Sequence, residues 1–192
     1  LTNSMFKYIL KKSDLIEVAD KTTADFLNKE YKINNKIDFP YWGIDTEEFK
    51  PIKTKKNIHV LYLRKASQKY STDVYIEALN IVKKKFPKFI SALIRDKSYV
   101  RIERMINKYK LEKNIRNLER TPHEKIPKLL NSSLMYVDSF HRNTSGGCVG
   151  ITTMEAMACE VPIILADNPG VRDYVKKNYN GLIYKGGDSK EL

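Results

Sequence analysis

The chain has 192 residues, 42% of them hydrophobic and 30% charged, and its 35 Lys and Arg against 23 Asp and Glu give a formal net charge of +12. This composition excludes a disordered chain and suffices for the core of one domain, or of one domain plus part of another. The longest apolar runs, such as residues 161–166, have the length of a strand, so no transmembrane helix is expected. Two cysteines, Cys148 and Cys159, are too few for a disulfide framework and lack zinc-site spacing, which favours a reducing, cytoplasmic setting.

The first fifty residues predict a group of short elements: a helix over residues 4–12, a strand over 15–18, a helix over 22–30 and a strand over 37–39. A turn-rich segment, residues 40–51, follows. We therefore expect residues 1–40 to be the end of one domain with its linker, and residues 41–192 to form a second domain. The chain starts at Leu1 rather than Met and stops in what resembles a first helical turn, so we expect a piece of a larger protein, truncated at its C-terminus.

From about residue 55 onward, short apolar runs alternate with helical patterns, which is typical of βαβ units. The clearest helix covers residues 73–86, where Val74, Ala78 and Val82 share one face. The other predicted helices cover residues 100–110, 124–131, 151–159 and 171–177. The predicted strands cover residues 57–63, 89–94, 114–118, 134–137, 162–166 and 181–184. This order predicts the α/β class, with a Rossmann-like, doubly wound parallel sheet.

The positive charge is concentrated in one part of the sequence. Between Lys50 and Lys88 there are eleven cations against only Asp73 and Glu77, a net +9 of the total +12. This segment predicts an anionic partner, which could be a phosphate, a nucleic acid or acidic lipid headgroups. Composition leaves these three open.

Two of these cations follow the first strand of the predicted sheet. In open parallel sheets, ligands bind beyond the carboxyl ends of the strands. Arg64 comes directly after the strand at residues 57–63, and Lys69 lies five residues later, in a loop before the next helix. The pair could bind a diphosphate through charge-assisted hydrogen bonds. Read alone, the two residues could equally be solvated loop charges.

A glycine-rich segment precedes the predicted helix at residues 151–159, and its glycines are Gly146, Gly147 and Gly150. The backbone N–H groups at such a helix start can receive phosphate oxygens. Thr152 and Thr153 add hydroxyl donors, and Glu155, one turn further, could accept hydrogen bonds from the vicinal hydroxyls of a ribose. The alternative is an ordinary glycine turn followed by a carboxylate that complements the helix dipole. The spacing is neither GxGxxG nor that of a P-loop, which disfavours classical dinucleotide binding and P-loop ATP hydrolysis.

Together these segments resemble the donor-binding C-terminal domain of GT-B fold glycosyltransferases, specifically the retaining enzymes of glycosyltransferase family 4 (glycosyl transferases group 1). Arg64 and Lys69 resemble the paired diphosphate-binding residues of that family. The three other blocks are residues 42–51 (WGIDTEEFKP), which resemble its interdomain segment, residues 154–164 (MEAMACEVPII), and residues 168–184, which contain NPGVRDYV and NGLIY. The resemblance covers essentially the whole chain.

The resemblance implies a hexosyltransferase that moves a sugar, with retention, from a UDP-, GDP- or ADP-sugar to a glycan, lipid or small-molecule acceptor, without cofactor or metal. Arg64 and Lys69 would be catalytic, and Glu155 would bind the ribose. The other implied donor-binding residues are Gly147, Cys148, Gly150, Ile151, Thr152, Thr153, Leu118 and Thr121, the last two near the base. This chain would be the donor-binding part, inactive in transfer by itself.

The chain departs from the family pattern at Gly147, where the family has the first glutamate of its E-x7-E motif, which contacts the transferred sugar. One hypothesis is that His141 or Asn143 supplies this contact; the alternative is that their loop is an irregular surface loop.

Other functions stay open as alternatives. A degenerate, non-catalytic module could bind a partner or a polyanion, and the basic segment leaves a peripheral contact with an acidic membrane open. Nucleic acid is disfavoured because Tyr62 and Tyr75 fall on core positions rather than on a stacking platform. His59 is interpreted as a strand residue and His123 as a helix-start residue, neither placed for catalysis.

Overall fold

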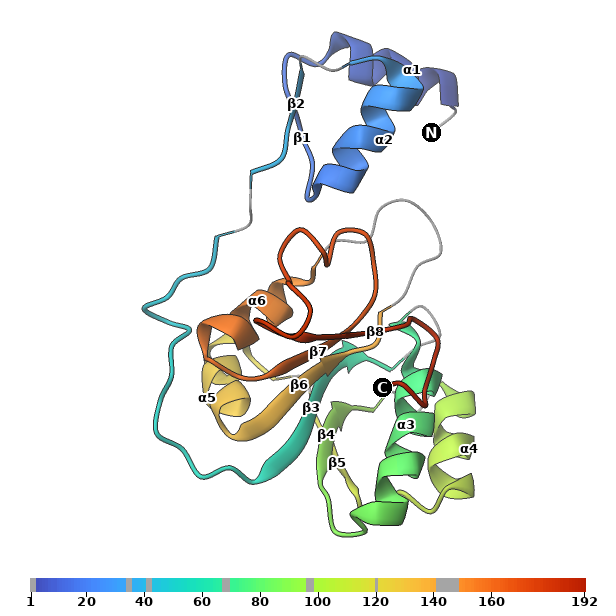
Figure 1. Cartoon of the computed structure of the whole chain (residues 1–192), viewed down its shortest axis with the longest axis vertical. Coiled ribbons are helices and arrows are strands. Elements are labelled where there is room, and N and C mark those ends of the chain that lie inside the picture. The colour runs from blue at the N-terminus through green and yellow to red at the C-terminus, as the bar shows by residue number, and fades with distance from the viewer. Residues whose placement is uncertain are drawn as a thin grey trace.

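The computed structural model describes residues 3–33, 36–40, 43–66, 70–95, 99–119, 121–140 and 149–192, and it contains two separate sheets (Figure 1). The large one has six strands: β3 (Ile58–Lys65), β4 (Ser91–Ile94), β5 (Ile115–Leu118), β6 (Ser133–Asp138), β7 (Ile163–Ala166) and β8 (Leu182–Tyr184). Their spatial order is β5-β4-β3-β6-β7-β8, and every neighbouring pair is parallel. The predicted α/β, doubly wound parallel sheet is confirmed.

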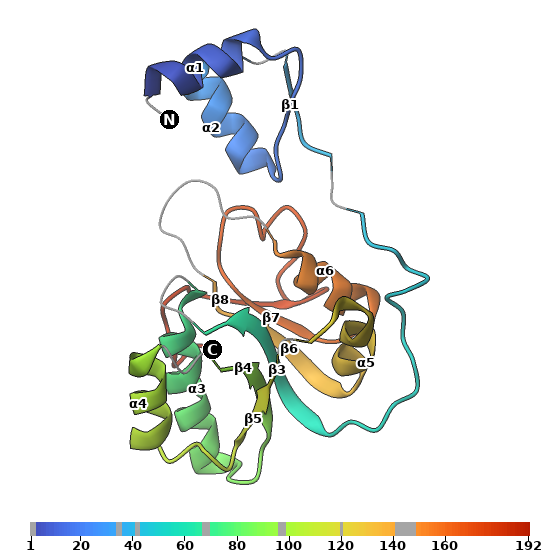
Figure 2. The same ribbon diagram turned by 180° about the vertical axis from the view of Figure 1, so that it is seen from behind.

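Helices cover both faces of this sheet (Figures 1 and 2). One face carries α3 (Thr72–Lys85) and α4 (Val100–Lys108), and the other carries α5 (Ile126–Asn131) and α6 (Ile151–Ala158). Side chains alternate between the faces along each strand, so Leu61 packs on the α5–α6 side and Tyr62 on the α3–α4 side, both fully buried. Because the connections run in opposite directions from the central strands, β3 and β6 flank the topological switch point, where ligands of such sheets bind.

One predicted helix is wrong. Residues 171–177 form turns, although Val171 and Val175 are buried in the core as the pattern required. The side chain of Asn180 accepts from the Lys176 N–H at 2.8 Å and donates to the Tyr174 carbonyl at 3.1 Å. The Asn180 side chain therefore bonds to backbone groups that would otherwise be free for the hydrogen bonds of a helix, and such bonding competes with helix formation. The predicted helix at residues 124–131 is also divided, into a 3-10 turn, η3 (His123–Lys125), and α5, which has a proline in its first turn.

The four predicted N-terminal elements are observed. They are α1 (Asn3–Lys12), β1 (Ile16–Glu17), α2 (Lys21–Tyr31) and β2 (Ile37–Asp38), and β1 pairs in parallel with β2. Their small core contains Leu10, Leu27 and Ile33. The group contacts the large domain at Lys21, whose N–H donates to Asp173 Oδ2 at 3.1 Å. No helix in the described part of the chain is long and apolar enough to cross a membrane.

The segment that enters the large sheet is tied to α5 by one side chain. Asn131 donates from Nδ2 to the Lys50 carbonyl at 3.0 Å, and its Oδ1 accepts from the Ile52 N–H at 2.9 Å. Phe49, just upstream, is 2% exposed and packs in the core on the α5–α6 face. The chain is therefore fixed to the domain from Phe49 onward.

Gly181 precedes β8 at a point of close approach to the core. A Cβ atom built there would lie 2.8 Å from Ile163 Cγ1 and 2.9 Å from Val175 Cγ1. We expect Gly181→Ala to lower the free energy of unfolding by about 1–3 kcal/mol through overpacking. Urea denaturation would measure this, with Gly43→Ala as control, because a Cβ at Gly43 would meet no atom within 4 Å. Equal stability of the two variants would contradict the prediction.

Candidate functional site

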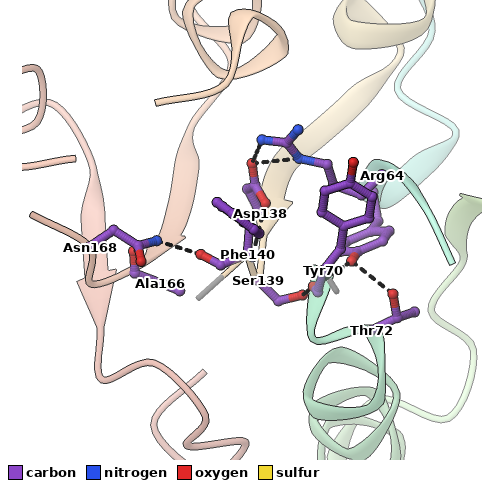
Figure 3. A network of polar contacts seen from close by, with 9 residues as sticks. Arg64, Tyr70, Thr72, Asp138, Ser139, Phe140, Ala166 and Asn168 are labelled. Atoms are coloured by element: carbon purple, nitrogen blue, oxygen red, sulfur yellow. Dashed lines mark hydrogen bonds and ion pairs between the residues drawn. The ribbon is translucent and has the colours of Figure 1, made fainter. Parts of the chain in front are cut away.

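The candidate site lies at the switch point, where the carboxyl ends of β3 and β6 lie side by side. Arg64, near the end of β3, donates from Nε and Nη2 to Oδ2 of Asp138, the last residue of β6, at 3.0 and 2.8 Å (Figure 3). Asp138 Oδ1 in turn accepts from the Phe140 N–H at 3.0 Å. The Asp138 carboxylate therefore holds one edge of the guanidinium in place and leaves the remaining N–H groups of Arg64 on its other edges.

Arg64 is a fixed cation in partly buried surroundings. Its side chain is 25% exposed and that of Asp138 is 8% exposed. Burial by itself lowers the pKa of Arg64, but the charge and hydrogen bonds of Asp138 outweigh it and raise the pKa above its ordinary value. The guanidinium therefore stays charged at neutral pH.

Aromatic rings and the start of α6 surround the same guanidinium. Its Cζ lies 5.3 Å from the centre of the Tyr70 ring and 5.6 Å from that of Phe140. A Cβ at Gly150, the N-cap residue of α6, would collide with the Arg64 guanidinium. A glycine is thus required for the cation to lie against the start of this helix, and the structure brings two of the predicted site residues, Arg64 and Gly150, together.

A polar network lies beside this cation and joins the end of β6 to the start of α3 (Figure 3). Ser139 Oγ lies 2.9 Å from the Tyr70 carbonyl and 3.2 Å from Tyr62 Oη, which lies 3.1 Å from Thr72 Oγ1. On the other side, Asn168 donates to the Phe140 carbonyl. These bonds fix the two residues that follow Asp138.

The predicted residues of α6 differ in their exposure. Ile151 is 46% exposed and Thr152 is half-buried, whereas Thr153 is 1% exposed. Thr153 lines a small pocket with Asp138 and Gly150. Gly150, the N-cap residue, has no side chain with which to cap α6, and among the first N–H groups of the helix that of Thr153 donates to the Gly150 carbonyl at 2.9 Å.

Glu155 lies one turn further along α6 and is buried, with 4% of its surface exposed. Its Oε1 lies 3.0 Å from Nε2 of His123, and Nδ1 of His123 lies 3.5 Å from Oε1 of Glu48. The prediction that His123 starts a helix is confirmed, because η3 begins at this residue. The contact between His123 and Glu155 was not predicted. No signal in the sequence predicts it, because 32 residues separate the two.

The surroundings of His123 predict a pH-dependent stability. The hydrogen bond to Glu155, with the charges of Glu155, Glu48 and Glu124, raises the pKa of His123 above 6.5. A raised folded-state pKa means that the stabilisation is complete below about pH 6.5 and is lost as the pH rises through the folded-state value. We expect the loss of unfolding free energy in His123→Gln to be larger at about pH 6 than at about pH 9 in urea titrations. An equal loss at both would contradict this.

The remaining predicted residues are placed as follows. Leu118 ends β5 and packs half-buried against the core, and Thr121 Oγ1 donates to the Glu119 carbonyl at 3.1 Å. Together they begin the segment that leads from β5 to His123. The others lie outside the described residues: Lys69, His141, Asn143, Gly147 and Cys148. In the described part of the chain, no group of three His, Cys, Asp or Glu side chains is arranged to hold a metal ion.

This sheet order, with a cation and a helix start at the switch point, is that of the Rossmann-like C-terminal domain of the GT-B fold. The chain belongs to the family of glycosyl transferases group 1, whose model matches residues 43–192. In sequence it is 21% identical over 196 residues to an uncharacterized glycosyltransferase of Methanocaldococcus jannaschii, MJ1069, covering 97% of this chain and 49% of that protein. The chain thus spans about half the length of this relative.

Solved structures share the fold at low identity. Anabaena HepE in complex with UDP and glucose has a TM-score of 0.81 and 18% identity over 99% of this chain and 55% of that one. A glycosyltransferase from Rickettsia africae has a TM-score of 0.82 and 18% identity, covering 100% and 55%. The C-terminal domain of LpcC from Francisella tularensis has a TM-score of 0.66 and 19% identity, covering 77% of this chain and 83% of that domain.

Proposed function

We propose that this chain is the donor-binding part of a retaining hexosyltransferase that transfers a sugar from a nucleotide-diphosphate donor to a glycan, lipid or small-molecule acceptor. The observation that carries this proposal is the guanidinium of Arg64, held by Asp138 against the start of α6 at the switch point. A cation and a helix N-terminus that meet in this way suit a diphosphate. The fold relative HepE was solved with UDP and glucose, which supports the same ligand class for this chain.

In this proposal each group acts on a part of the donor. Arg64 and Lys69 bind the diphosphate and stabilise the negative charge that grows on it as the glycosidic bond breaks. The N-terminus of α6, which begins at Ile151, adds to the same stabilisation, with the hydroxyls of Thr152 and Thr153 as further donors. Because these protein groups supply the positive charge, the mechanism needs no cofactor and no metal.

The other proposed contacts are with the ribose, the base and the sugar of the donor. Glu155 accepts hydrogen bonds from the ribose hydroxyls, and Leu118 and Thr121 lie near the base. The transferred sugar meets His141 or Asn143, because Gly147 has no side chain to offer it, while Cys148 lies beside the ligand. By itself the chain would bind the nucleotide without transferring sugar.

The proposal is tested by titrating the chain with UDP-, GDP- and ADP-sugars and following its thermal unfolding. A ligand at a hundred times its Kd adds about 2.7 kcal/mol to the unfolding free energy. We expect one of the three series to stabilise the protein and Glu155→Ala to abolish the effect. Glu112→Ala, which removes an exposed carboxylate from the turn between α4 and β5, serves as control. Stabilisation by none of the three, or equal stabilisation of Glu155→Ala, would refute the proposal.

A peripheral contact with an acidic membrane, as part of acceptor supply, rests on the cations at the end of α3. Lys83 is engaged within the protein, because its Nζ donates to the Tyr109 and Lys110 carbonyls at 3.2 and 2.5 Å. Lys84 and Lys85 follow it in the last turn of α3, beside Phe86, which is 64% exposed. Sedimentation with phosphatidylserine vesicles, at low and high salt, tests this part of the proposal.

A further inference from the structure

Three segments that are distant in the sequence meet at the imidazole of His123. Glu155 comes from α6, His123 from the start of η3, and Glu48 with Phe49 from the segment that enters the large sheet. The imidazole of His123 lies between the two carboxylates, with Nε2 toward Glu155 and Nδ1 toward Glu48. The Phe49 ring packs against it, edge to face, with ring centres 5.3 Å apart. The imidazole is therefore held from several sides.

The hydrogen bonding of Glu155 is incomplete. Its side chain is 5% exposed, and among the described residues its carboxylate has one hydrogen bond, between Oε1 and His123. A carboxylate offers about four acceptor positions, and leaving them unfilled in a buried place is costly. Oε2 makes no hydrogen bond to the described residues and can accept one from a ligand. Hydroxyl groups suit it, because an ionised carboxylate can only accept.

The bond from His123 determines what the carboxylate can offer. The contact of Oε1 with Nε2 restricts rotation of the carboxyl group, and Oε2 and the second lone pair of Oε1 remain as acceptors. Two neighbouring hydroxyls, such as those of a ribose, match that arrangement. Without His123 the side chain would be able to rotate, and ordering it would then weaken binding.

We propose that His123 is a positioning residue, which fixes Glu155 for the vicinal hydroxyls of the donor ribose and thereby makes the site select ribonucleotides over 2′-deoxyribonucleotides. This inference rests on the proposed function. The Glu48 carboxylate, 3.5 Å from Nδ1, and the Phe49 ring are the other groups that lie against the imidazole, and Glu124 acts on it through its charge.

The test compares the Kd of three nucleotide pairs by calorimetry, UDP, GDP and ADP, each against its 2′-deoxy form, and continues with the pair that binds best. We expect the wild type to prefer the ribonucleotide about tenfold or more, the value of one hydrogen bond to a charged group. His123→Asn, whose amide is too short to reach Oε1, should reduce the preference to about threefold or less. His123→Gln should keep most of it, because its amide can still donate. His59→Gln, on β3 and outside the site, is the control.

Each outcome separates a different claim. A variant that weakens both members of the pair equally, with the ratio unchanged, would show a merely structural role and overturn the inference. A wild type that binds none of the three ribonucleotides would instead overturn the proposed function. Wild-type binding without a preference for the ribonucleotide would leave the diphosphate proposal intact and refute the role of His123 and Glu155 in selecting the ribose.

Discussion

On the proposed function, replacing Arg64 with alanine is expected to lower the rate of sugar transfer about a hundredfold or more in a protein that joins this chain to an acceptor-binding part. The reason is that a preorganised donor is lost from the place where negative charge develops on the leaving diphosphate, and removing one such donor costs a factor of this size in other enzymes. Because Arg64 is already fixed by Asp138 and by two aromatic rings, little reorganisation is needed when the charge appears.

Initial rates at saturating donor would measure the effect, together with the Kd of the nucleoside diphosphate for the isolated chain. Arg104→Ala is the matched control, since it removes an exposed arginine of α4. Arg64→Lys should give an intermediate rate, because lysine keeps the charge but cannot reproduce the planar hydrogen-bonding edge. A rate for Arg64→Ala within a few-fold of the control would exclude Arg64 from the catalytic role.

Replacing Asp138 with alanine is expected to lower the free energy of unfolding by about 2–3 kcal/mol. Removing one partner of a fully buried ion pair costs about 3–5 kcal/mol, because the other charge stays buried and unpaired. The loss is smaller for this pair because the Arg64 side chain is 25% exposed and water can reach part of it.

Chemical denaturation of three variants checks this prediction. Asp167→Ala is the control, because it breaks an ion pair whose two side chains are more exposed, Asp167 at 32% and Arg172 at 69%. This variant should lower the free energy of unfolding by less than about 1 kcal/mol. The double variant Arg64→Ala with Asp138→Ala should recover part of the loss, because no unpaired charge remains. If Asp138→Ala were no less stable than Asp167→Ala, the pair would not hold the switch point together.

The sequence predicted the six strands and their parallel arrangement because apolar runs of strand length and helical spacing are local properties. Arg64 and Glu155 could be chosen as candidate site residues because each has a defined position relative to a predicted strand or helix. The wrong helix at residues 171–177 shows the limit of that method. Its apolar spacing was right, but Asn180, beyond the end of the predicted helix, bonds to the backbone of this segment.

The partners of the site residues could not be predicted in this way. Asp138 reaches Arg64 across 74 positions and His123 reaches Glu155 across 32. Both contacts depend on which strands become neighbours and on where the connection after β5 crosses to the other face. Nothing in the spacing of the residues along the chain encodes that arrangement.

The attachment of the entering segment by Asn131 has a mechanical consequence. Since the chain is bound to α5 at Lys50 and Ile52 and buried at Phe49, these residues must travel with the large sheet as one rigid piece. Any rotation of the N-terminal helices relative to that sheet must therefore pivot upstream of Phe49. Because Glu48 lies beside Phe49 in this rigid piece and also against His123, a strain on the entering segment would be transmitted to the imidazole that contacts Glu155.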